Sequence, residues 1–338
     1  MSGFEILSIA PNATIQDRGR SGYLRFGVTG GGAMDVYALA EGQALLGNGP
    51  DDAALEFAAY GGRFCARGRL WVALSGGDMR TTLNGTPVGW RCAFQLEDGD
   101  ILDVGAATQG VYGYLHVAGG FQTQVVLGAR ATHPGAGFGH VPEAGQVLEA
   151  GRETSEQGAV TLPTPRYLLG REIRMMWGPQ SHYFSDEMRA DFAGSTFTAT
   201  STRDRMGVRV LPDMGDVYSD AGLSIASDAI NLGDIQIPGD HIPAILLADR
   251  GSSGGYPRIA TVIGADLPAV AQMAAPRRFT MAVVSRAEAV QAWAKLQSEL
   301  AALPKKVTPL VRDPREMRDL LAYNLVDGML RGDEYDNG

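Results

Sequence analysis

The chain has 338 residues, of which 45% are hydrophobic, and it carries a formal net charge of −9 at pH 7. This length allows about two domains, and an acidic surface repels phosphate backbones, so we expect no nucleic-acid partner. Lysine occurs only at Lys295, Lys305 and Lys306, which excludes a Schiff base, a P-loop lysine and a biotin-carrying lysine from residues 1–294.

Short β-strands dominate the predicted elements. Glycines and prolines are spread along the chain and separate apolar runs rich in β-branched and aromatic residues. Such a pattern favours barrels or sandwiches over a doubly wound sheet. The predicted strands are Arg69–Ser75, Gly110–Ala118, Arg171–Trp177, Ala244–Ala248, Ile259–Ile263 and Arg278–Val284.

Three helices are predicted, one early and two at the end of the chain. The first, Asp35–Leu46, begins at an aspartate cap and stops at Gly47. The second, Ser285–Leu303, opens with a capping box formed by its first residue and Glu288. The third begins near Asp313, and its apolar stripe packs either on the chain's own core or on a partner.

An internal match divides the chain. Gly99–Phe121 and Gly233–Tyr256 each begin Gly-Asp-Ile, run through a strand and end Gly-Gly-aromatic, and the polar stretch Gly151–Pro165 between them is interpreted as a linker. A duplicated barrel explains the match, and a chance likeness of Gly-rich turns is the alternative. We predict a first domain at residues 1–160, a second at 166–290 and a helical tail at 291–338.

Two loops near the N-terminus carry candidate anion-binding groups. In the Gly-rich turn around Asp17 and Arg20, a fixed guanidinium could bind a carboxylate or phosphate bidentately, although the residue types alone favour a surface turn with a structural salt bridge. The Gly loop Thr29–Asp35 runs into a helix whose N-terminus attracts anions, but it lacks the P-loop pattern.

The loop Asp249–Arg258 is the most suggestive segment of the second half. It follows an apolar strand and combines backbone donors with two arginines and one aspartate. An anion or amide site and a plain turn both fit these residues.

Several other kinds of chemistry lack their motifs. Cys65 and Cys92 fit no metal spacing and no disulfide framework, and the five histidines are not paired at metal-ligand spacing. No Gly-x-Ser-x-Gly elbow is present, so the pattern favours electrostatic stabilisation of an anionic intermediate over covalent hydrolysis. We expect no metal site. A signal peptide and an 18-residue apolar run are also missing, so we expect a cytoplasmic protein without a membrane span.

A series of short motifs occurs in order between residues 4 and 290. They are Gln16–Tyr23, Gly32–Asp35, Leu46–Asn48, Leu55-Glu56, Val117–Phe121, Gly178–Gln180, Asp204–Gly207, Asp249-Arg250 and Gly254–Pro257. In number and order they resemble the biotin-dependent carboxyltransferase family of KipA-like proteins. Members of this family are also called allophanate hydrolase subunit 2, urea amidolyase-related protein or the C subunit of 5-oxoprolinase.

The resemblance implies a mainly β fold with two tandem cyclophilin-like β-barrel domains, a few short helices and a helical C-terminal tail. It implies a KipI-like B subunit as partner. In a 5-oxoprolinase complex a third subunit would join them, and ATP would act through the complex. In a carboxyltransferase, carboxybiotin would come on a separate carrier. Three departures from the family pattern leave the substrate open. They are Gly251 in place of Gln, Arg203 in place of Ser, and the run Gly128–Thr132.

We therefore expect a subunit of a multi-component ATP-dependent hydrolase that acts on a small amide or lactam and is inactive alone, and we favour the C subunit of 5-oxoprolinase. The expected catalytic residues are Asp17, Asp204, Arg205 and Asp249. The expected substrate-binding residues are Arg20, Asp35, Arg250, Gly254, Gly255 and Tyr256.

Two other functions stay open at this point. A carboxyltransferase subunit would move a carboxyl group from carboxybiotin to urea or a related amide, and its activity would be sensitive to avidin. A regulatory protein of the KipI and kinase type would instead form a stable complex with a histidine kinase without turning over an amide.

Overall fold

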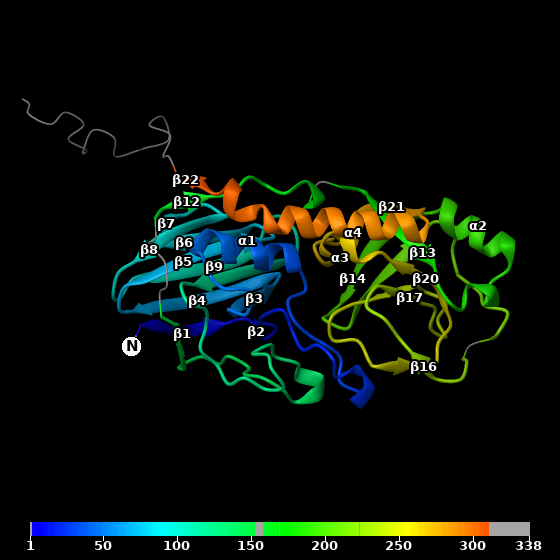
Figure 1. Cartoon of the computed structure of the whole chain (residues 1–338), viewed down its shortest axis with the longest axis horizontal. Coiled ribbons are helices and arrows are strands. Elements are labelled where there is room, and N and C mark those ends of the chain that lie inside the picture. Colours follow the sequence, from blue (N-terminus) through cyan, green and yellow to red (C-terminus); the bar gives the residue numbers. More distant parts are fainter. Residues whose placement is uncertain (1, 153–157, 169, 223, 311–338) are drawn as a thin grey trace, which may run out of the picture.

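The computed structural model describes residues 2–152, 158–168, 170–222 and 224–310, which form two β-rich halves side by side (Figure 1). Within these residues, the first half is built on a 13-stranded sheet and the second on a closed barrel of seven strands. The predicted mainly β class with a few short helices is confirmed. The predicted third helix, near Asp313, lies outside the described residues.

The sheet of the first half runs in the order β22-β12-β8-β5-β10-β3-β4-β9-β6-β7, while β1 pairs with β4 and β11, and β2 pairs with β3. The strands are β1 Gly3–Ile9, β2 Thr14–Gln16, β3 Ala54–Ala58, β4 Tyr60–Arg67, β5 Leu70–Gly76, β6 Met79–Leu83, β7 Thr86–Pro87, β8 Cys92–Leu96, β9 Ile101–Ala107, β10 Tyr112–Val117, β11 Val147–Glu149, β12 Val160–Thr161 and β22 Thr308–Pro309.

The barrel closes in the order β13-β20-β17-β18-β15-β14-β21, and β16 pairs with β19 beside it. The strands are β13 Glu172–Trp177, β14 Thr196–Arg203, β15 Gly207–Pro212, β16 Asp228–Ala229, β17 Asp234–Gln236, β18 Ala244–Leu246, β19 Ser253–Gly254, β20 Arg258–Val262 and β21 Arg278–Val283. The helices of this half are α2 Asp186–Gly194 and α3 Leu267–Ala271.

Helix α1, Val36–Leu46, forms where its caps predict it. The Asp35 carboxylate accepts hydrogen bonds from the first turn, and Gly47 ends the helix in the left-handed conformation. One face of α1 packs closely on the sheet, because His116 of β10 lies directly against Gly42. Burial lowers the pKa of His116 to about 3, so this imidazole is neutral at physiological pH.

Replacing Gly42 with alanine will destabilise the chain, although the same change in a free helix would stabilise it by up to about 1 kcal/mol. A Cβ at this position would lie 2.1 Å from His116 Cδ2, and such overpacking costs about 1–3 kcal/mol. Urea unfolding measures the effect. Gly194 in α2 is the matched control, because a Cβ there meets nothing within 4 Å. A Gly42→Ala variant as stable as the Gly194→Ala variant would contradict this packing.

The two halves share a hydrophobic core rather than only a polar boundary. Ala38 and Leu39 of α1 and Tyr112 of β10 belong to the same buried cluster as barrel residues such as Phe197 and Ile245. Since apolar burial is the main favourable term in folding, this continuity holds the two halves in one arrangement.

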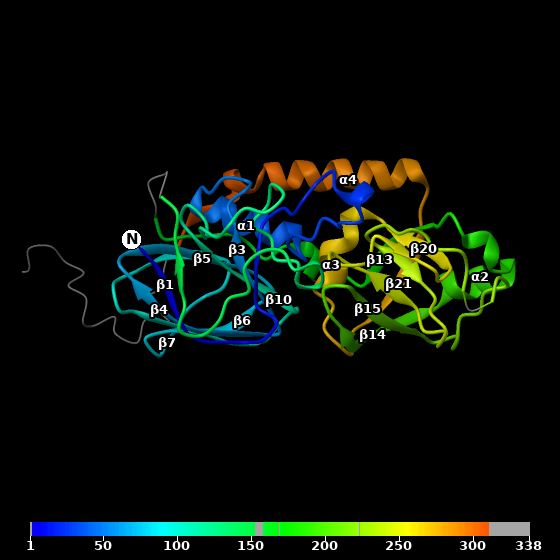
Figure 2. The ribbon, with the colours of Figure 1, turned by 90° about the horizontal axis from the view of Figure 1, so that it is seen from below.

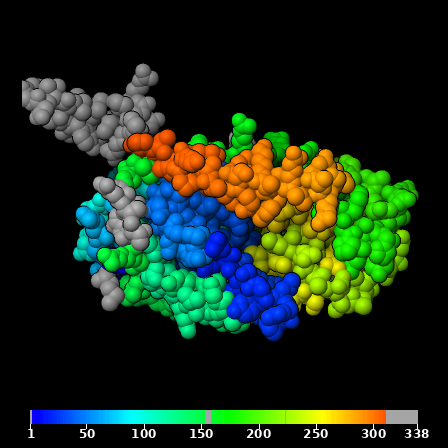
Figure 3. Space-filling view, viewed as in Figure 1, coloured from blue at the N-terminus to red at the C-terminus, as the bar shows by residue number. Residues whose placement is uncertain are grey.

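Helix α4, Arg286–Ala301, has the predicted capping box at Ser285 and Glu288. It runs over both halves (Figures 1 and 2), and the space-filling view shows it laid across them (Figure 3). Leu296, and Leu303 just beyond the helix, pack with α1 and β5 in one buried cluster, so the apolar stripe of this helix docks on the chain's own core. No helix in the described part of the chain has the length and apolar character needed to span a bilayer.

The stretch Gly151–Pro165 is not only a linker. Val160 and Thr161 form β12, which pairs with β8 on one side and with β22 on the other. Leu162 is buried beside them in the cluster below α4. This strand could not be predicted from the sequence. It has only two residues, which are too few to give a hydrophobic period, and it lies in a polar, Pro-rich stretch.

The matched segments Gly99–Phe121 and Gly233–Tyr256 are not equivalent in the fold, so their interpretation as copies of one unit is wrong. In the second segment the two strands, β17 and β18, pair with each other. In the first segment, β9 pairs with β4 and β6, while β10 pairs with β3 and β5. The match therefore reflects similar turn chemistry at strand ends.

Candidate active site between the halves

A pocket of about 960 Å³ lies between the two halves. The first half lines it with residues before and in β2, the ends of β3, β9 and β10, and the turns at Thr29 and His133. The barrel lines it with the turns Arg203–Met206 and Asp249–Gly251. This volume is in the usual range for ligand sites, and the pocket exists only when both halves are in place.

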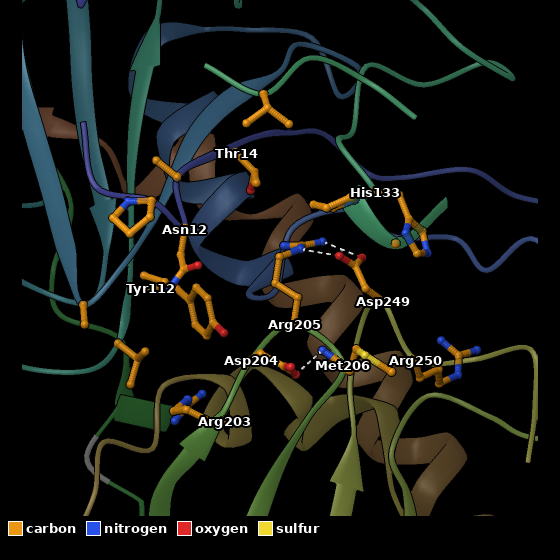
Figure 4. Close-up of a pocket in the computed structure, with 18 of the residues that line it drawn as sticks. Asn12, Thr14, Tyr112, His133, Arg203, Asp204, Arg205, Met206, Asp249 and Arg250 are labelled. Carbon is orange, nitrogen blue, oxygen red and sulfur yellow. Dashed lines mark hydrogen bonds and ion pairs between the residues drawn. The ribbon is translucent and has the colours of Figure 1, made fainter. Parts of the chain in front are cut away.

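Arg205 lies at this boundary and donates four hydrogen bonds, to residues of both halves. Its Nε and Nη2 donate to the two carboxylate oxygens of Asp249 at 2.7 and 2.9 Å, as Figure 4 shows. Nη2 also donates to the carbonyl of Gly32 at 2.7 Å, and Nη1 donates to Glu56. A guanidinium held by both halves is best suited to position Asp249 and the Gly32 loop.

Glu56 is the buried counterpart of Arg205 in the first half. It is 1% exposed and also accepts hydrogen bonds from the Met34 amide at 2.8 Å and the Tyr114 hydroxyl at 2.7 Å. Burial raises the pKa of Glu56, and the charge of Arg205 opposes that rise. Although burial disfavours a charged Arg205, the carboxylates of Glu56 and Asp249 hold its pKa above the usual value. The Arg205 guanidinium and the Glu56 carboxylate thus stabilise each other's charged forms.

Asp17 and Arg20 shape the loops of the first half. The carboxylate of Asp17 accepts from the amides of Gly19 and Arg130 at 2.8 and 2.6 Å, which ties two loops together. The guanidinium of Arg20 is buried and donates to the carbonyls of Val126 and Ala131. Burial lowers the pKa of Arg20, and Asp17 and Asp249 oppose this. Asp17 and Arg20 line a second, smaller pocket of about 560 Å³.

Asp35 lies away from solvent and makes only structural contacts. One carboxylate oxygen caps α1, and the other accepts from the Tyr167 hydroxyl at 2.6 Å and the Gln272 amide at 2.8 Å. Burial raises the pKa of Asp35 against the effect of these hydrogen bonds. Gln272 also bonds the backbone of Val111 and Tyr112, so this cluster pins the barrel to the first half.

The candidates of the second half separate into two groups. Asp204 is exposed in the pocket wall and accepts from the Met206 amide at 2.7 Å, and Arg250 lines the same wall. In contrast, Gly254, Gly255 and Tyr256 are outside the pocket lining, and Tyr256 is 43% exposed.

Arg258 fixes the position of the loop Gly254–Tyr256 outside the pocket. Its buried guanidinium binds Asp234 at 3.0 Å and Asp228 at 2.5 Å, and Gln180 accepts from its Nε at 3.0 Å. This network fixes the start of β20 and the β16–β19 pair. The charge of Arg258 is therefore engaged inside the barrel and is not available to a ligand in the pocket between the halves.

Two of the three departures from the family pattern line the pocket. Gly251 stands where a side chain would be crowded, because a Cβ there would lie 3.2 Å from the backbone oxygen of Ser253. Arg203 donates to backbone carbonyls of α3 and the following loop, and its guanidinium lies 5.5 Å from the ring centroid of Tyr112. Burial lowers the pKa of Arg203, and Tyr112 opposes this.

Four residues of this boundary were missing from the residues predicted for the site: Thr29, Glu56, His133 and Gln272. Glu56 carried a signal, because it is a lone acid in the apolar strand Ala54–Ala58. Thr29 carried a signal only as part of the candidate anion-binding loop. His133 and Gln272 carried no signal, since each meets its partner more than a hundred residues away. Among the described residues, no group of three or more His, Cys, Asp or Glu is placed to hold a metal ion.

Comparison with known proteins identifies the class to which this two-part, β-rich chain belongs. Residues 26–282 match the family described as "Carboxyltransferase domain, subdomain A and B", and the chain belongs to this family. It is 34% identical to the 5-oxoprolinase C subunit of Haemophilus influenzae, over 85% of this chain and 93% of that protein. For the 5-oxoprolinase C subunit of Escherichia coli the identity is 30%, over 80% and 87% of the two chains.

The solved structures show the same fold within longer proteins. The urea amidolyase of K. lactis superposes with a TM-score of 0.80 at 25% identity, covering 92% of this chain but 21% of that chain. The protein TTHA0988 gives a TM-score of 0.76 at 26% identity, over 84% of this chain and 56% of that one. The chain thus spans about a fifth of the amidolyase and about half of TTHA0988.

Proposed function

We propose that this chain is the C subunit of a 5-oxoprolinase, which opens 5-oxoproline to glutamate with ATP in a complex with a KipI-like B subunit and a third subunit. The observation that carries the proposal is similarity to 5-oxoprolinase C subunits over nearly the whole of both chains. Urea amidolyases match this chain over only 16% of their own length. The rest of their activity therefore resides in segments outside this match.

The pocket suits a small amide that carries an anionic group. Asp249 is held by Arg205, which leaves its position fixed, and Arg250 provides a second guanidinium in the same wall. A guanidinium positioned in this way stabilises an anionic intermediate without a covalent step. We therefore assign Asp249 and Arg250 to the substrate, and Arg205 to their positioning.

Co-purification with the KipI-like subunit, followed by an ATPase assay of the assembled complex, tests the proposal. Adding 5-oxoproline should stimulate ATP hydrolysis and release glutamate, whereas urea should not. Stimulation by urea that avidin abolishes would instead favour the carboxyltransferase function, which the family match supports. A complex that responds to neither compound would contradict both assignments.

Replacing Arg250 with alanine should raise KM for 5-oxoproline about 10- to 100-fold. This range corresponds to the loss of a hydrogen bond to a charged group, which contributes about 1.5–3 kcal/mol. Within the protein its Nε makes a long hydrogen bond of 3.4 Å to the Ile230 carbonyl, so stability should change little. Burial lowers the pKa of Arg250, and Asp234 opposes this. The exposed Arg286 of α4 is the matched control. An unchanged KM in the Arg250→Ala variant would remove Arg250 from the site.

A further inference from the structure

Thr29 and His133 meet at the edge of the pocket, although 104 residues separate them in the chain. Thr29 Oγ1 and His133 Nε2 are 2.9 Å apart, and the two residues are 3% and 6% exposed. Both line the pocket that also contains Asp249. In the view of Figure 4, Asp249 lies between Arg205 and His133. A hydroxyl at this distance from an imidazole is within reach for direct proton transfer.

The backbone fixes both side chains. Thr29 precedes a loop that is anchored where the Arg20 amide donates to the Gly30 carbonyl at 2.8 Å. His133 begins a tight turn in which its amide donates to the Phe138 carbonyl at 2.9 Å. The preceding Thr132 amide is bonded to the Ile15 carbonyl of β2 at 2.8 Å. The pair is therefore preorganised by main-chain hydrogen bonds rather than by flexible side chains.

Unused hydrogen-bonding capacity gathers beside this pair. Within the described residues, His133 Nδ1 and Arg20 Nη1 are buried polar atoms without a hydrogen-bond partner, whereas such atoms are normally paired. A Cβ placed on Gly31 would lie 3.7 Å from His133 Cδ2, 3.7 Å from Arg20 Nη1 and 3.5 Å from Asp249 Oδ1. An imidazole, a guanidinium and a carboxylate thus converge on one point of the Gly31 loop.

We propose that Thr29 and His133 form a proton-transfer pair that serves the amide nitrogen of the substrate in this pocket. The inference rests on the proposed function, since a lactam or urea nitrogen must change its protonation during the reaction. Thr29 would contact the substrate, and His133 would act through Thr29. Arg20, whose Nη1 approaches the same point of the Gly31 loop as His133, would supply a positive charge beside the pair.

The proton balance of lactam opening fits such a pair. The oxygen of water bonds to the carbonyl carbon and water gives up one proton, while the electron pair of the broken C–N bond remains on nitrogen, which takes up one proton. His133 accepts the first proton through the Thr29 hydroxyl and returns one to nitrogen by the same path. The pair therefore ends in its starting state. Carboxylation of urea would use only the removal of a proton from nitrogen.

The test compares Thr29→Val, Thr29→Ser and His133→Asn in the assembled complex, with kcat and KM measured for 5-oxoproline. We expect Thr29→Val and His133→Asn to lower kcat by about 10²- to 10⁴-fold with KM nearly unchanged, and Thr29→Ser to restore most of the rate. Thr81→Val is the matched control, because this buried threonine donates to the Met79 carbonyl at 3.2 Å and is absent from the pocket lining. It should retain the wild-type kcat.

The outcomes separate this inference from the function on which it rests. A wild-type complex that turns over neither 5-oxoproline nor urea contradicts the proposed function. An active wild type with full activity in Thr29→Val or in His133→Asn overturns the proton-transfer pair alone. Equal losses in Thr29→Ser and Thr29→Val would also overturn it. Serine keeps the hydroxyl, so a loss in that variant would mean that the rate depends on the threonine methyl group and not on proton transfer. Thermal unfolding of each variant identifies any rate lost through misfolding.

Discussion

Replacing Arg205 with alanine is expected to destabilise the chain by about 3–5 kcal/mol and to abolish the activity of the assembled complex. The variant would leave Glu56 and Asp249 buried and facing one another across the boundary without a compensating charge. An unpaired buried carboxylate costs far more than a missing hydrogen bond. Urea unfolding gives the change in stability, and turnover in the complex gives the change in activity.

The control for this prediction is Arg209, which lies on β15 only four residues away. Its partner, Asp240, is exposed, so Arg209→Ala should cost about 0–1 kcal/mol. Equal destabilisation by the two substitutions would show that the position of Arg205 between the halves has no special energetic weight. Full activity of Arg205→Ala would remove Arg205 and its partners from the candidate site.

Replacing Asp35 with alanine is expected to cost about 3–5 kcal/mol of stability, with little direct effect on substrate binding. The variant loses the cap of α1, worth about 0.5–2 kcal/mol. It also leaves the Tyr167 hydroxyl and the Gln272 amide without their acceptor, and each buried group left unsatisfied costs about 1–3 kcal/mol. Thermal and urea unfolding measure the loss.

Ser185, the cap of α2, is the matched control because its side chain accepts from the Met188 amide at an exposed helix start. Ser185→Ala should cost only about 1 kcal/mol. If Asp35→Ala instead kept its stability and raised KM for 5-oxoproline, the interpretation of Asp35 as a substrate-binding residue, made from the sequence, would hold against the structural role.

Local features of the fold could be predicted from the sequence because local interactions determine them. The capping box at Ser285 and the Asp35–Gly47 helix limits are set by residues a few positions apart. Each apolar run predicted as a strand is a strand. The strand pairing could not be derived in this way, since Gly99–Phe121 and Gly233–Tyr256 look alike but have different neighbours in space.

The candidate site shows the same limit. Asp249 and Arg205 could be predicted because Asp-Arg pairs stand out in Gly-rich loops, and they do meet at 2.7 Å. The sequence could not separate them from Asp17 and Asp35, which do not line the pocket between the halves. Which polar groups remain available to a ligand depends on contacts between the halves, and no pattern along one segment reports these contacts.

The path of α4 has a thermodynamic consequence for ligand binding. The chain crosses from the sheet to the barrel before β13 and returns along α4 to β22, which pairs with β12. Two crossings and a shared apolar core restrict the motions that would separate the pocket walls. The pocket is therefore ordered when the chain folds. Binding of a small ligand does not have to offset the conformational entropy lost in ordering the pocket walls.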